Sequence, residues 1–375
     1  MIPESQVAQS RGRTCGRGVH ATLDPVQAGS PTTEAAAPVG FGDDVQARPP
    51  AIPVGLSRVG VTGVEKVVRI RDELFFARLD CFVDLGRDQK GAHMSRFDEV
   101  VNEAIGQVVL SESPFQAETL AQHIAELVRE RQGAERAEVT IAARYPEHKP
   151  APVSGVNTQE IYTLHGRAVA YQHGTRRTVG VSATGMTACP CAQELVAARA
   201  RARLSEQGFD DRQIEQVLAS VPVATHNQRG LATLQVGLTE RCTDEIDATT
   251  LLGIAEASMS SEIYELMKRS DEVEVVEKAH RRPRFVEDCV REMIAGVVAT
   301  YGDLGGACFV SARQENLETI HQHNVVAERH GLLSELRDEL HTGLAGAHHT
   351  TLEEWLAGTA ESAPPSAQVP ATDAD

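Results

Sequence analysis

The chain is poor in aromatic residues and has no hydrophobic run long enough to cross a bilayer. Phe, Trp and Tyr make up only 4% of its 375 residues, so a core has to be built mainly from Val, Leu, Ile and Ala. No stretch approaches the roughly 20 apolar residues of a membrane helix. Residues 1–21 also lack the apolar segment of a secretory signal. We therefore expect a cytoplasmic protein with no membrane partner.

Positive charge is also scarce. The 36 Lys and Arg against 53 Asp and Glu give a net charge of −17, which argues against nucleic acid as a partner. An anionic substrate would need a local cluster of basic side chains. The 7 cysteines are irregularly spaced and do not suggest a disulfide framework. In a reducing compartment the close pair Cys189 and Cys191 is more typical of a metal-binding or catalytic site.

The order of predicted elements indicates an α+β fold with an antiparallel sheet. Residues 1–55, rich in Pro, Gly, Ala, Ser and Thr, are predicted to be a disordered extension, and 351–375 a mostly disordered tail. Between them, two strands, two helices and two strands occur twice, which suggests a duplicated unit. The first unit covers 56–178. The second covers 179–350 and carries a helical insertion over 194–223.

Hydrophobic periodicity gives the individual elements. Strands are predicted over 59–71, 74–85, 137–145, 160–174, 231–238 and 307–313. A further strand is predicted to end near residue 183. Helices are predicted over 96–110, 114–132, 248–259 and 284–301.

The segment 185–194 combines two thiols with a proline. Because Pro190 lacks an N–H and pushes the preceding residues toward extended geometry, we expect helix only after the cysteines. Cys189 and Cys191 would then alternate on an extended segment and could face one cavity. A thiolate at a helix start is suited to bind metal or attack an electrophile. Two small buried hydrophobic side chains are the alternative, but the flanking Gly and Thr favour function.

Other polar segments lie beside predicted strands and helices. His226 could be a neutral imidazole ligand, or its segment could be a surface loop. The Lys-Arg pair at 268–269 beside carboxylates, taken alone, is typical of a solvated face. His321 and His323 alternate around a polar residue, and 91–97 is predicted to close a hairpin. One Cys, one His and one Glu from separate segments make a plausible catalytic site for zinc or iron(II), and the residues alone do not indicate which Glu.

Taken together, these segments resemble one enzyme family. The motifs follow the family's order: His-Met-Ser-Arg-Phe at 93–97, Gly-Met-Thr-Ala-Cys-Pro-Cys-Ala-Gln at 185–193, Thr-His-Asn-Gln-Arg-Gly at 225–230, Lys-Arg-Ser-Asp-Glu at 268–272, Phe-Val-Glu-Asp at 285–288 and Glu-Thr-Ile-His-Gln-His at 318–323. The chain is similar to the GTP cyclohydrolases of the prokaryotic type IB group, which includes the archaeal methanopterin-pathway enzyme. The resemblance covers about 57–330. It implies a tunnelling fold of two tandem ββααββ modules that assembles into a barrel-like homotetramer.

The resemblance also implies roles for individual residues. Cys189, His226 and Glu272 would bind a divalent metal, with iron(II) favoured and zinc or manganese possible. Glu287 would be the general acid/base that moves protons at N7 and N9 of guanine. Glu318 would hold the base, because a carboxylate can accept hydrogen bonds from both N1–H and the exocyclic amine. Catalysis would thus fall to Cys189, Glu287 and Glu318.

The implied reaction adds water to C8 of GTP, opens the imidazole ring and releases C8 as formate. A bound metal would lower the pKa of a coordinated water to about 7. Basic side chains of the motifs are the candidates for binding the phosphates: His93, Arg96, Arg229, Lys268 and Arg269. GTP and further copies of the same chain are therefore the expected partners.

The product and the reaction class have alternatives. The insertion over 194–223 resembles the archaeal-type members, which favours 7,8-dihydroneopterin 2′,3′-cyclic phosphate; 7,8-dihydroneopterin triphosphate, for folate or deazapurine synthesis, is the alternative. An NADPH-dependent nitrile reductase of the same fold would use Cys189 as a nucleophile, but its Glu-Ser-Lys signature is absent. A structural zinc module would not need Glu287 and Glu318. Cys191 is hypothesised to be a redox partner of Cys189.

Overall fold

The computed structural model describes residues 44–70, 73–109, 116–344, 346 and 348–358. Its strands are β1 (Leu56–Ile70), β2 (Glu73–Leu85), β3 (Ala137–Pro150), β4 (Asn157–Tyr171), β5 (Gly174–Ala188), β6 (Asn227–Leu238), β7 (Ser261–Glu262), β8 (Phe309–Leu317) and β9 (Val325–Leu332). Its helices are α1 (Met94–Val109), α2 (Ala117–Gln132), α3 (Pro190–Glu206), α4 (Asp211–Ser220), α5 (Ala248–Ser258), α6 (Arg269–Arg281), α7 (Val286–Tyr301), α8 (Leu333–Thr342) and α9 (Leu352–Leu356).

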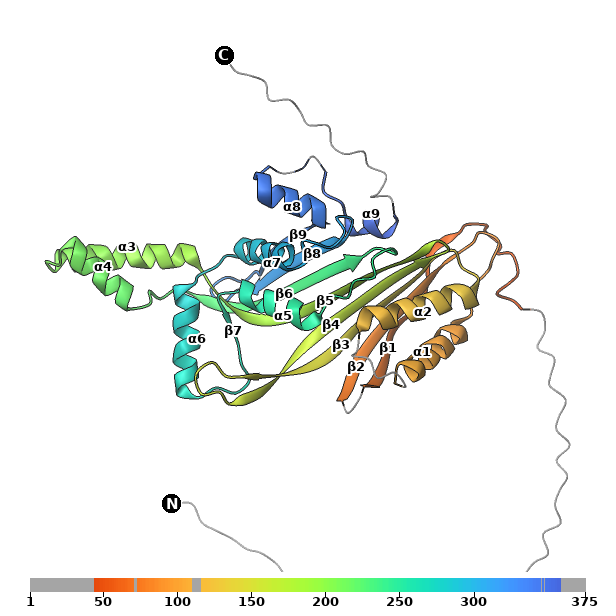
Figure 1. The fold of residues 1–375 in the computed structure, drawn as a ribbon, viewed down its shortest axis with the longest axis horizontal. Helices are drawn as coiled ribbons and strands as arrows, with labels where there is room; N and C mark the ends of the chain where they lie inside the picture. The colour runs from red at the N-terminus through yellow and green to blue at the C-terminus, as the bar shows by residue number, and fades with distance from the viewer. Residues whose placement is uncertain (1–43, 71–72, 110–115, 345, 347, 359–375) are drawn as a thin grey trace, which may run out of the picture. The chain divides into compact units, whose positions relative to one another are not determined.

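The strands form one antiparallel sheet that runs through both halves of the chain (Figure 1). Its order is β1-β2-β3-β4-β5-β6-β8-β9, and the short β7 pairs with β5. Each neighbouring pair in this order is antiparallel. The prediction of an α+β fold with an antiparallel sheet is therefore confirmed.

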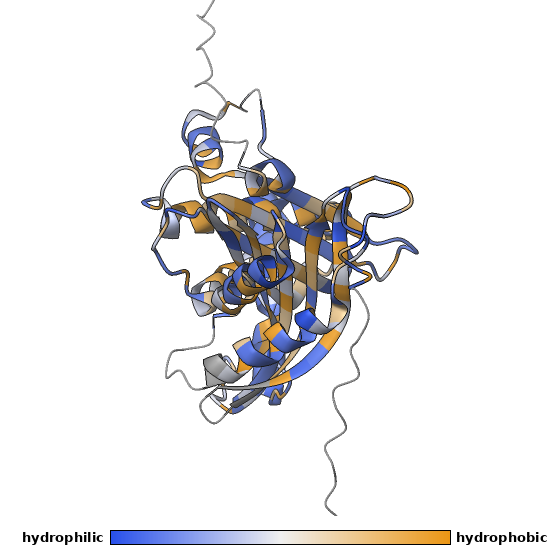
Figure 2. Ribbon diagram, turned by 90° about the vertical axis from the view of Figure 1, so that its right-hand side faces the viewer, coloured by the Kyte–Doolittle hydropathy of each residue, from blue (hydrophilic) through white to orange (hydrophobic). Residues whose placement is uncertain are grey.

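One face of the sheet carries the helices and the core. Along β2, Phe75, Ala77 and Leu79 are buried, whereas Phe76 and Arg78 between them are exposed. This alternation places one set of side chains under the helices, since successive residues of a strand point to opposite faces. Helix α2 covers β3, β4 and β5, α5 covers β5 and β6, and α7 covers β8 and β9. In Figure 2, hydrophobic residues form bands on the strands and on the helices that cover them.

Helix α2 lies so close to β4 that only glycine fits at one point of contact. A Cβ added to Gly166 would lie 2.3 Å from the carbonyl oxygen of Ala117. The side chain of Glu118, in the first turn of α2, is closed in by this contact and is only 4% exposed. Burial removes the water that would stabilise the charged carboxylate, which favours the neutral form of the group.

The ends of the predicted folded region need correction. Helix α9 lies inside the predicted tail 351–375: Trp355 is fully buried, stacks on Phe309 with ring centroids 5.5 Å apart, and donates from Nε1 to Ala307 O at 2.8 Å. Residues 1–43 and 359–375, the rest of the two predicted tails, lie outside the described residues. The Gln46 carbonyl accepts hydrogen bonds from the backbone N–H groups of Lys90 and Gly91, so the predicted extension is already attached before residue 55.

Several elements were predicted wrongly or were missed. Residues 91–97 do not close a hairpin; they lead into α1, which begins at Met94. The charged segment after 268 is helix α6. Its apolar buried positions, Val275 and Ala279, are few, so the charged residues around them obscure the helical pattern in the sequence. Strand β9 and helix α8 were not predicted. Among the described residues, no helix is both long and apolar enough to cross a membrane.

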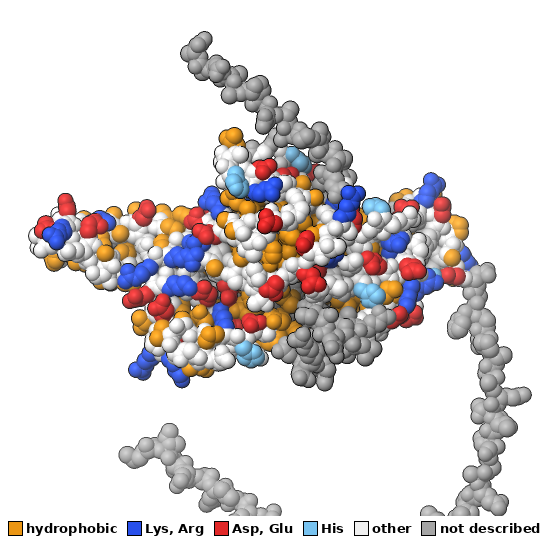
Figure 3. All heavy atoms as spheres, viewed as in Figure 1, with side chains coloured by type: hydrophobic (Ala, Val, Ile, Leu, Met, Phe, Trp, Pro, Cys, Tyr) orange, Lys and Arg blue, Asp and Glu red, His pale blue; other side chains and the backbone are white. Residues whose placement is uncertain are grey.

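Two helices stand apart from the sheet. Helices α3 and α4 pack against each other and project from the rest of the chain (Figure 1). They form the predicted insertion, although α3 begins earlier than expected. On the face drawn in Figure 3, Lys and Arg side chains gather around α6, next to the base of this projection.

We predict that Glu118 makes the stability of the fold depend on pH. Burial raises the pKa of Glu118 from 4.5 to about 7, although its own backbone N–H and Arg177 oppose the shift. A group whose pKa is raised by folding contributes stability that is lost as pH rises from the unfolded to the folded pKa. We therefore expect Glu118→Gln to become more stable relative to the wild type between pH 4.5 and 8, by up to about 3 kcal/mol.

Thermal unfolding across this pH range checks the prediction. Glu130→Gln, which changes an exposed carboxylate on the same helix, is the matched control and should follow the wild type. Parallel curves for Glu118→Gln and the wild type would contradict the prediction.

Candidate functional site

The pairing of β5 with β6 brings Cys189 and His226 side by side. Ala188, the last residue of β5, pairs with Asn227, the first residue of β6. One residue beyond, the Cys189 N–H donates to the His226 carbonyl at 3.1 Å. The hydroxyl of Thr225 donates to the Cys189 carbonyl at 2.8 Å. Backbone hydrogen bonds therefore fix the positions from which both side chains project.

The two cysteines do not share an extended segment. Cys189 is extended, with φ −74° and ψ 117°, and caps α3, but the helix begins at Pro190 and includes Cys191. Proline suits the first helical position because its missing N–H has no helical partner there. Cys191 is exposed, whereas Cys189 is half-buried. The expectation that helix starts only after both cysteines, with both thiols on one face, is therefore wrong.

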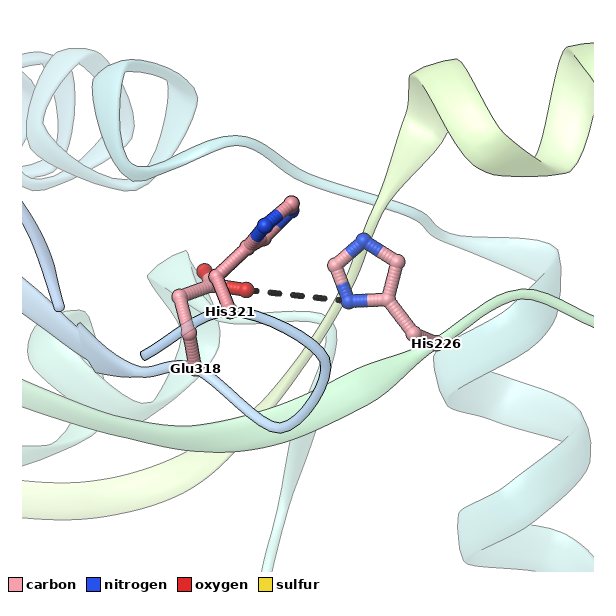
Figure 4. A group of neighbouring side chains, drawn as sticks. All are labelled: His226, Glu318 and His321. Atoms are coloured by element: carbon pink, nitrogen blue, oxygen red, sulfur yellow. Dashed lines mark ion pairs between the residues drawn. The ribbon is translucent and has the colours of Figure 1, made fainter. Parts of the chain in front are cut away.

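His226 faces a carboxylate and an amide. Its Nδ1 lies 3.2 Å from Gln228 Oε1 and 3.7 Å from Glu318 Oε2. Figure 4 shows the His226 ring facing the Glu318 carboxylate. The His226 side chain is 12% exposed and that of Glu318 is 6% exposed. Because the amide and carboxylate oxygens both accept, we assign the imidazole proton to Nδ1. The lone pair of Nε2 is then available to a ligand.

Glu318 is buried without a full set of partners. Its Oε2 has no hydrogen-bond partner within the part of the chain that the structure describes. A carboxylate oxygen in this condition costs free energy unless a ligand, ion or water satisfies it. The hydroxyl of Thr319, the next residue, donates to the Asn227 carbonyl at 3.0 Å and ties this loop to the start of β6. Glu318 is thus held beside His226 with an oxygen left to bind something.

A third side chain joins this pair. The rings of His226 and His321 meet edge to face, with centroids 6.0 Å apart, and His321 stacks on His323 at 5.4 Å. His226, Glu318 and His321 each offer one ligand atom, and these atoms all lie within 4.8 Å of one another. Two imidazoles and a carboxylate are ligands that zinc and iron(II) accept. The sequence marked His321 by its spacing from His323 and as part of the motif at 318–323, but not as a ligand.

More unsatisfied polar groups lie in the adjoining strands. The Oγ1 of Thr187 and the Oε1 of Gln314 are buried and have no hydrogen-bond partner among the described residues. Thr187 is paired with Gln228 across β5 and β6, and a Cβ added to Gly230 would lie 2.4 Å from Gln314 Nε2. Apolar side chains would be expected in a core of this kind. These oxygens are acceptors that a ligand, an ion or a water molecule would satisfy.

The motif at 268–272 divides into an inward and an outward part. Asp271 is fully buried, whereas Lys268, Arg269 and Glu272 are exposed in the first turn of α6. Among the described residues, neither Glu272 nor Cys189 belongs to a group of three or more His, Cys, Asp or Glu side chains whose ligand atoms all lie within 4.8 Å of one another. The predicted ligand set of Cys189, His226 and Glu272 therefore stays a prediction.

Glu287 occupies the first turn of α7 and is exposed. The start of this helix lies beside the cysteine segment, because the Arg284 N–H donates to the Ala188 carbonyl at 2.9 Å. Glu287 also lines a cavity of about 290 Å³ between α7, β9 and α8, together with Arg291 and Arg329. The Glu287 carboxylate is therefore exposed at the start of a helix whose preceding residues contact the end of β5.

The basic residues predicted to bind phosphate fall into two groups. Arg229 is exposed on β6 and pairs in register with Leu317, the residue before Glu318. His93 and Arg96 lie instead at the start of α1, where Arg96 donates to the Arg131 carbonyl at 2.8 Å. Helix α1 packs beside β1, at the opposite edge of the sheet from β8. The structure therefore does not bring His93 and Arg96 to His226 within one chain.

The chain is similar to proteins of one enzyme family. Residues 43–327 match the family model described as type I GTP cyclohydrolase folE2. The chain is 42% identical over 311 residues to the GTP cyclohydrolase MptA of Methanococcus maripaludis strain C6, covering 80% of this chain and 98% of the relative. It is 42% identical over 303 residues to the enzyme of the same name from Haloarcula marismortui, covering 79% and 97%. Among solved structures, the uricase from Arthrobacter globiformis aligns with a TM-score of 0.43 and 8% identity, covering 74% of this chain and 93% of the uricase.

Proposed function

This chain belongs to the type I GTP cyclohydrolase family and is a GTP cyclohydrolase, and we propose that it converts GTP to 7,8-dihydroneopterin 2′,3′-cyclic phosphate. The reaction adds water at C8, opens the imidazole ring and releases C8 as formate. The observation that carries the proposal is the buried Glu318 carboxylate, whose Oε2 lies beside His226 and has no hydrogen-bond partner among the described residues. A site that leaves a buried acceptor unpaired suits a base that brings its own donors.

Glu318 is proposed to hold guanine. Its carboxylate would accept hydrogen bonds from N1–H and the exocyclic amine, which guanine offers and adenine does not. Adenine would leave the buried acceptor unsatisfied, and such a mismatch gives strong discrimination. The same contacts would direct C8, on the other ring of the purine, toward the region of His226 and Cys189.

Cys189, His226 and Glu272 are proposed to bind the divalent metal, iron(II) for preference and otherwise zinc or manganese. The donors fit such an ion: Cys189 carries a half-buried thiol and is bonded through its backbone to His226, whose Nδ1 faces Gln228 and leaves Nε2 as the ligand atom. When bound, the metal would supply a Lewis acid that brings the pKa of water to about 7. His226, Glu318 and His321 form the other possible metal site.

Glu287 and the basic side chains are proposed to serve the remaining steps. Glu287, beside the Cys189 segment, would deliver protons to N7 and N9 as the ring opens. Arg229, Lys268 and Arg269 would bind the phosphates and supply positive charge that the acidic chain otherwise lacks. None of these three forms an ion pair within the described residues, so their charges are available.

The assembly is proposed to complete the site. His93 and Arg96 lie far along the sheet from His226 in one chain, so a role in phosphate binding requires a second copy. A tunnelling fold, built from modules 56–178 and 179–350, would provide this by forming a homotetramer with sites between subunits. The chain order β1-β2-α1-α2-β3-β4 fits one ββααββ module, but the boundary at 178/179 falls inside β5, so the division belongs in the turn between β4 and β5.

The first test is an anaerobic assay of metal-free protein with GTP. Iron(II), zinc or manganese is added separately, formate is measured, and the pterin is identified by chromatography. We expect formate together with the cyclic phosphate. Formate with 7,8-dihydroneopterin triphosphate would keep the ring opening and contradict the proposed product. No formate with any metal would contradict the function itself.

Two substitutions decide between the possible metal sites. We expect Cys189→Ser to weaken metal binding by more than the roughly 10–100-fold that loss of an outer-shell partner costs, and His321→Ala to weaken it less. Competition with a chelator of known affinity gives the dissociation constants. The reverse order would move the metal to the group formed by His226, Glu318 and His321.

Glu287→Gln should lower kcat by about 10²–10⁴-fold, because the amide cannot exchange protons with N7 and N9. Metal content and KM for GTP should change little, since Glu287 is not a proposed ligand. Glu292→Gln, another carboxylate of α7 that is paired with Arg284, is the matched control. Equal kcat values for the two variants would remove Glu287 from the proposed mechanism.

A further inference from the structure

We propose that the tip of the β3–β4 hairpin positions the first turn of α6, with Ser154 and Asp271 as positioning residues. The first turn carries Lys268, Arg269 and Glu272, and the inference rests on the proposed function for what these three do. The hairpin belongs to the first half of the chain and α6 to the second. Figure 1 shows the hairpin extending beyond the sheet to reach α6.

Asp271 forms the connection. Its Oδ1 accepts hydrogen bonds from the backbone N–H groups of Val153 at 2.9 Å and Ser154 at 2.8 Å. Its Oδ2 accepts from the Ser154 hydroxyl and from the Lys268 N–H, both at 2.7 Å. The four hydrogen bonds satisfy both oxygens of this fully buried carboxylate, so it has little capacity left to bind a ligand. Asp271 therefore acts on the site through its neighbours.

Because Asp271 lies in the first turn of α6, its contacts with the hairpin also fix the direction of the neighbouring side chains. Residues three apart lie on the same side of a helix, so Arg269 and Glu272 project together. Asp271 lies about 100° away from Glu272 around the helix axis and points to the hairpin. Holding Asp271 therefore sets the rotation of the turn, and with it the direction in which Glu272 and Arg269 face.

The hairpin is a firm support for this anchor. Its strands pair to the end, where Pro150 meets Asn157, and Gly155 makes the turn with φ of +65°. Farther back, Lys149 and the Tyr162 hydroxyl both bind Glu256 Oε1 at 2.7 Å. The hairpin is thus fixed to α5 as well as to α6, so its tip has little freedom to drift.

The other end of α6 is attached to the cysteine segment. Gln193, in the first turn of α3, donates from Nε2 to the His280 carbonyl at 2.5 Å and the Val223 carbonyl at 2.9 Å. Helix α6 therefore spans from the hairpin tip to the neighbourhood of Cys189 and His226. Glu272 lies in the first turn of this helix and His280 in the last turn, so both attachments set the position of Glu272 relative to Cys189.

Ser154 allows the inference to be tested with little risk to folding, since it is exposed in the turn. Ser154→Ala removes one hydroxyl from Asp271, and Ser154→Thr keeps it. Tyr162→Phe is the matched control, because it also removes one hydroxyl between the hairpin and the second half, but at α5. Hydrogen exchange of the amides at 268–275, metal affinity, and kcat and KM for GTP are measured on the full chain.

We expect Ser154→Ala to speed exchange at 268–275 and to weaken zinc binding by about 10-fold, as loss of an outer-shell partner does. KM for GTP should rise as Lys268 and Arg269 lose their orientation. Ser154→Thr should restore all of these values, and Tyr162→Phe should lower the melting temperature without changing them.

Unchanged exchange and metal affinity in Ser154→Ala, with metal binding lost in Glu272→Ala, would overturn the positioning role and leave the proposed function intact. Full metal binding and activity in Glu272→Ala would instead contradict the proposed ligand. The exchange measurement would still decide whether the hairpin orders the turn. Equal effects of Ser154→Ala and Tyr162→Phe on metal affinity would show general destabilisation and overturn the inference.

Discussion

The site depends on the register in which β5 pairs with β6. Because Ala188 meets Asn227, the next backbone hydrogen bond joins Cys189 to His226. The segment between these two residues, including α3 and α4, is an insertion that begins and ends at this pair. The slip of one residue would turn every side chain beyond it to the other face of the sheet. The pairing therefore fixes which thiol and which imidazole meet.

Around this pair, the protein leaves polar groups unsatisfied where a core would normally exclude them. Glu318, Thr187 and Gln314 each have a buried oxygen without a partner among the described residues. The hydrophobic packing of α5 and α7 against the sheet offsets the free-energy cost of these unsatisfied oxygens. Glu318 lies beside His226, and the side chains of Thr187 on β5 and Gln314 on β8 lie beside Gly230 of β6. Affinity for a polar ligand and reduced stability of the empty site thus have the same physical origin.

The two halves of the chain do different work. The described part of the first half carries none of the residues grouped around His226, yet its β3–β4 hairpin holds α6 through Asp271 and α5 through Glu256. Such contacts make the rigidity of the site a property of the continuous sheet. His93 and Arg96, at the far edge of that sheet, belong to the same site only if copies of the chain associate.

The sequence by itself determined the family, the antiparallel α+β class and the segments that carry the chemistry, because motif residues and strand periodicity are local. It did not determine that Pro190 starts a helix containing Cys191, that the charged run after Lys268 is a helix, or that Trp355 packs on Phe309. Each of these depends on contacts with segments that are distant in the sequence. Only the tertiary structure decided that His321 joins His226 and Glu318, and that Asp271 faces the hairpin, since contacts between distant segments follow from strand register and burial.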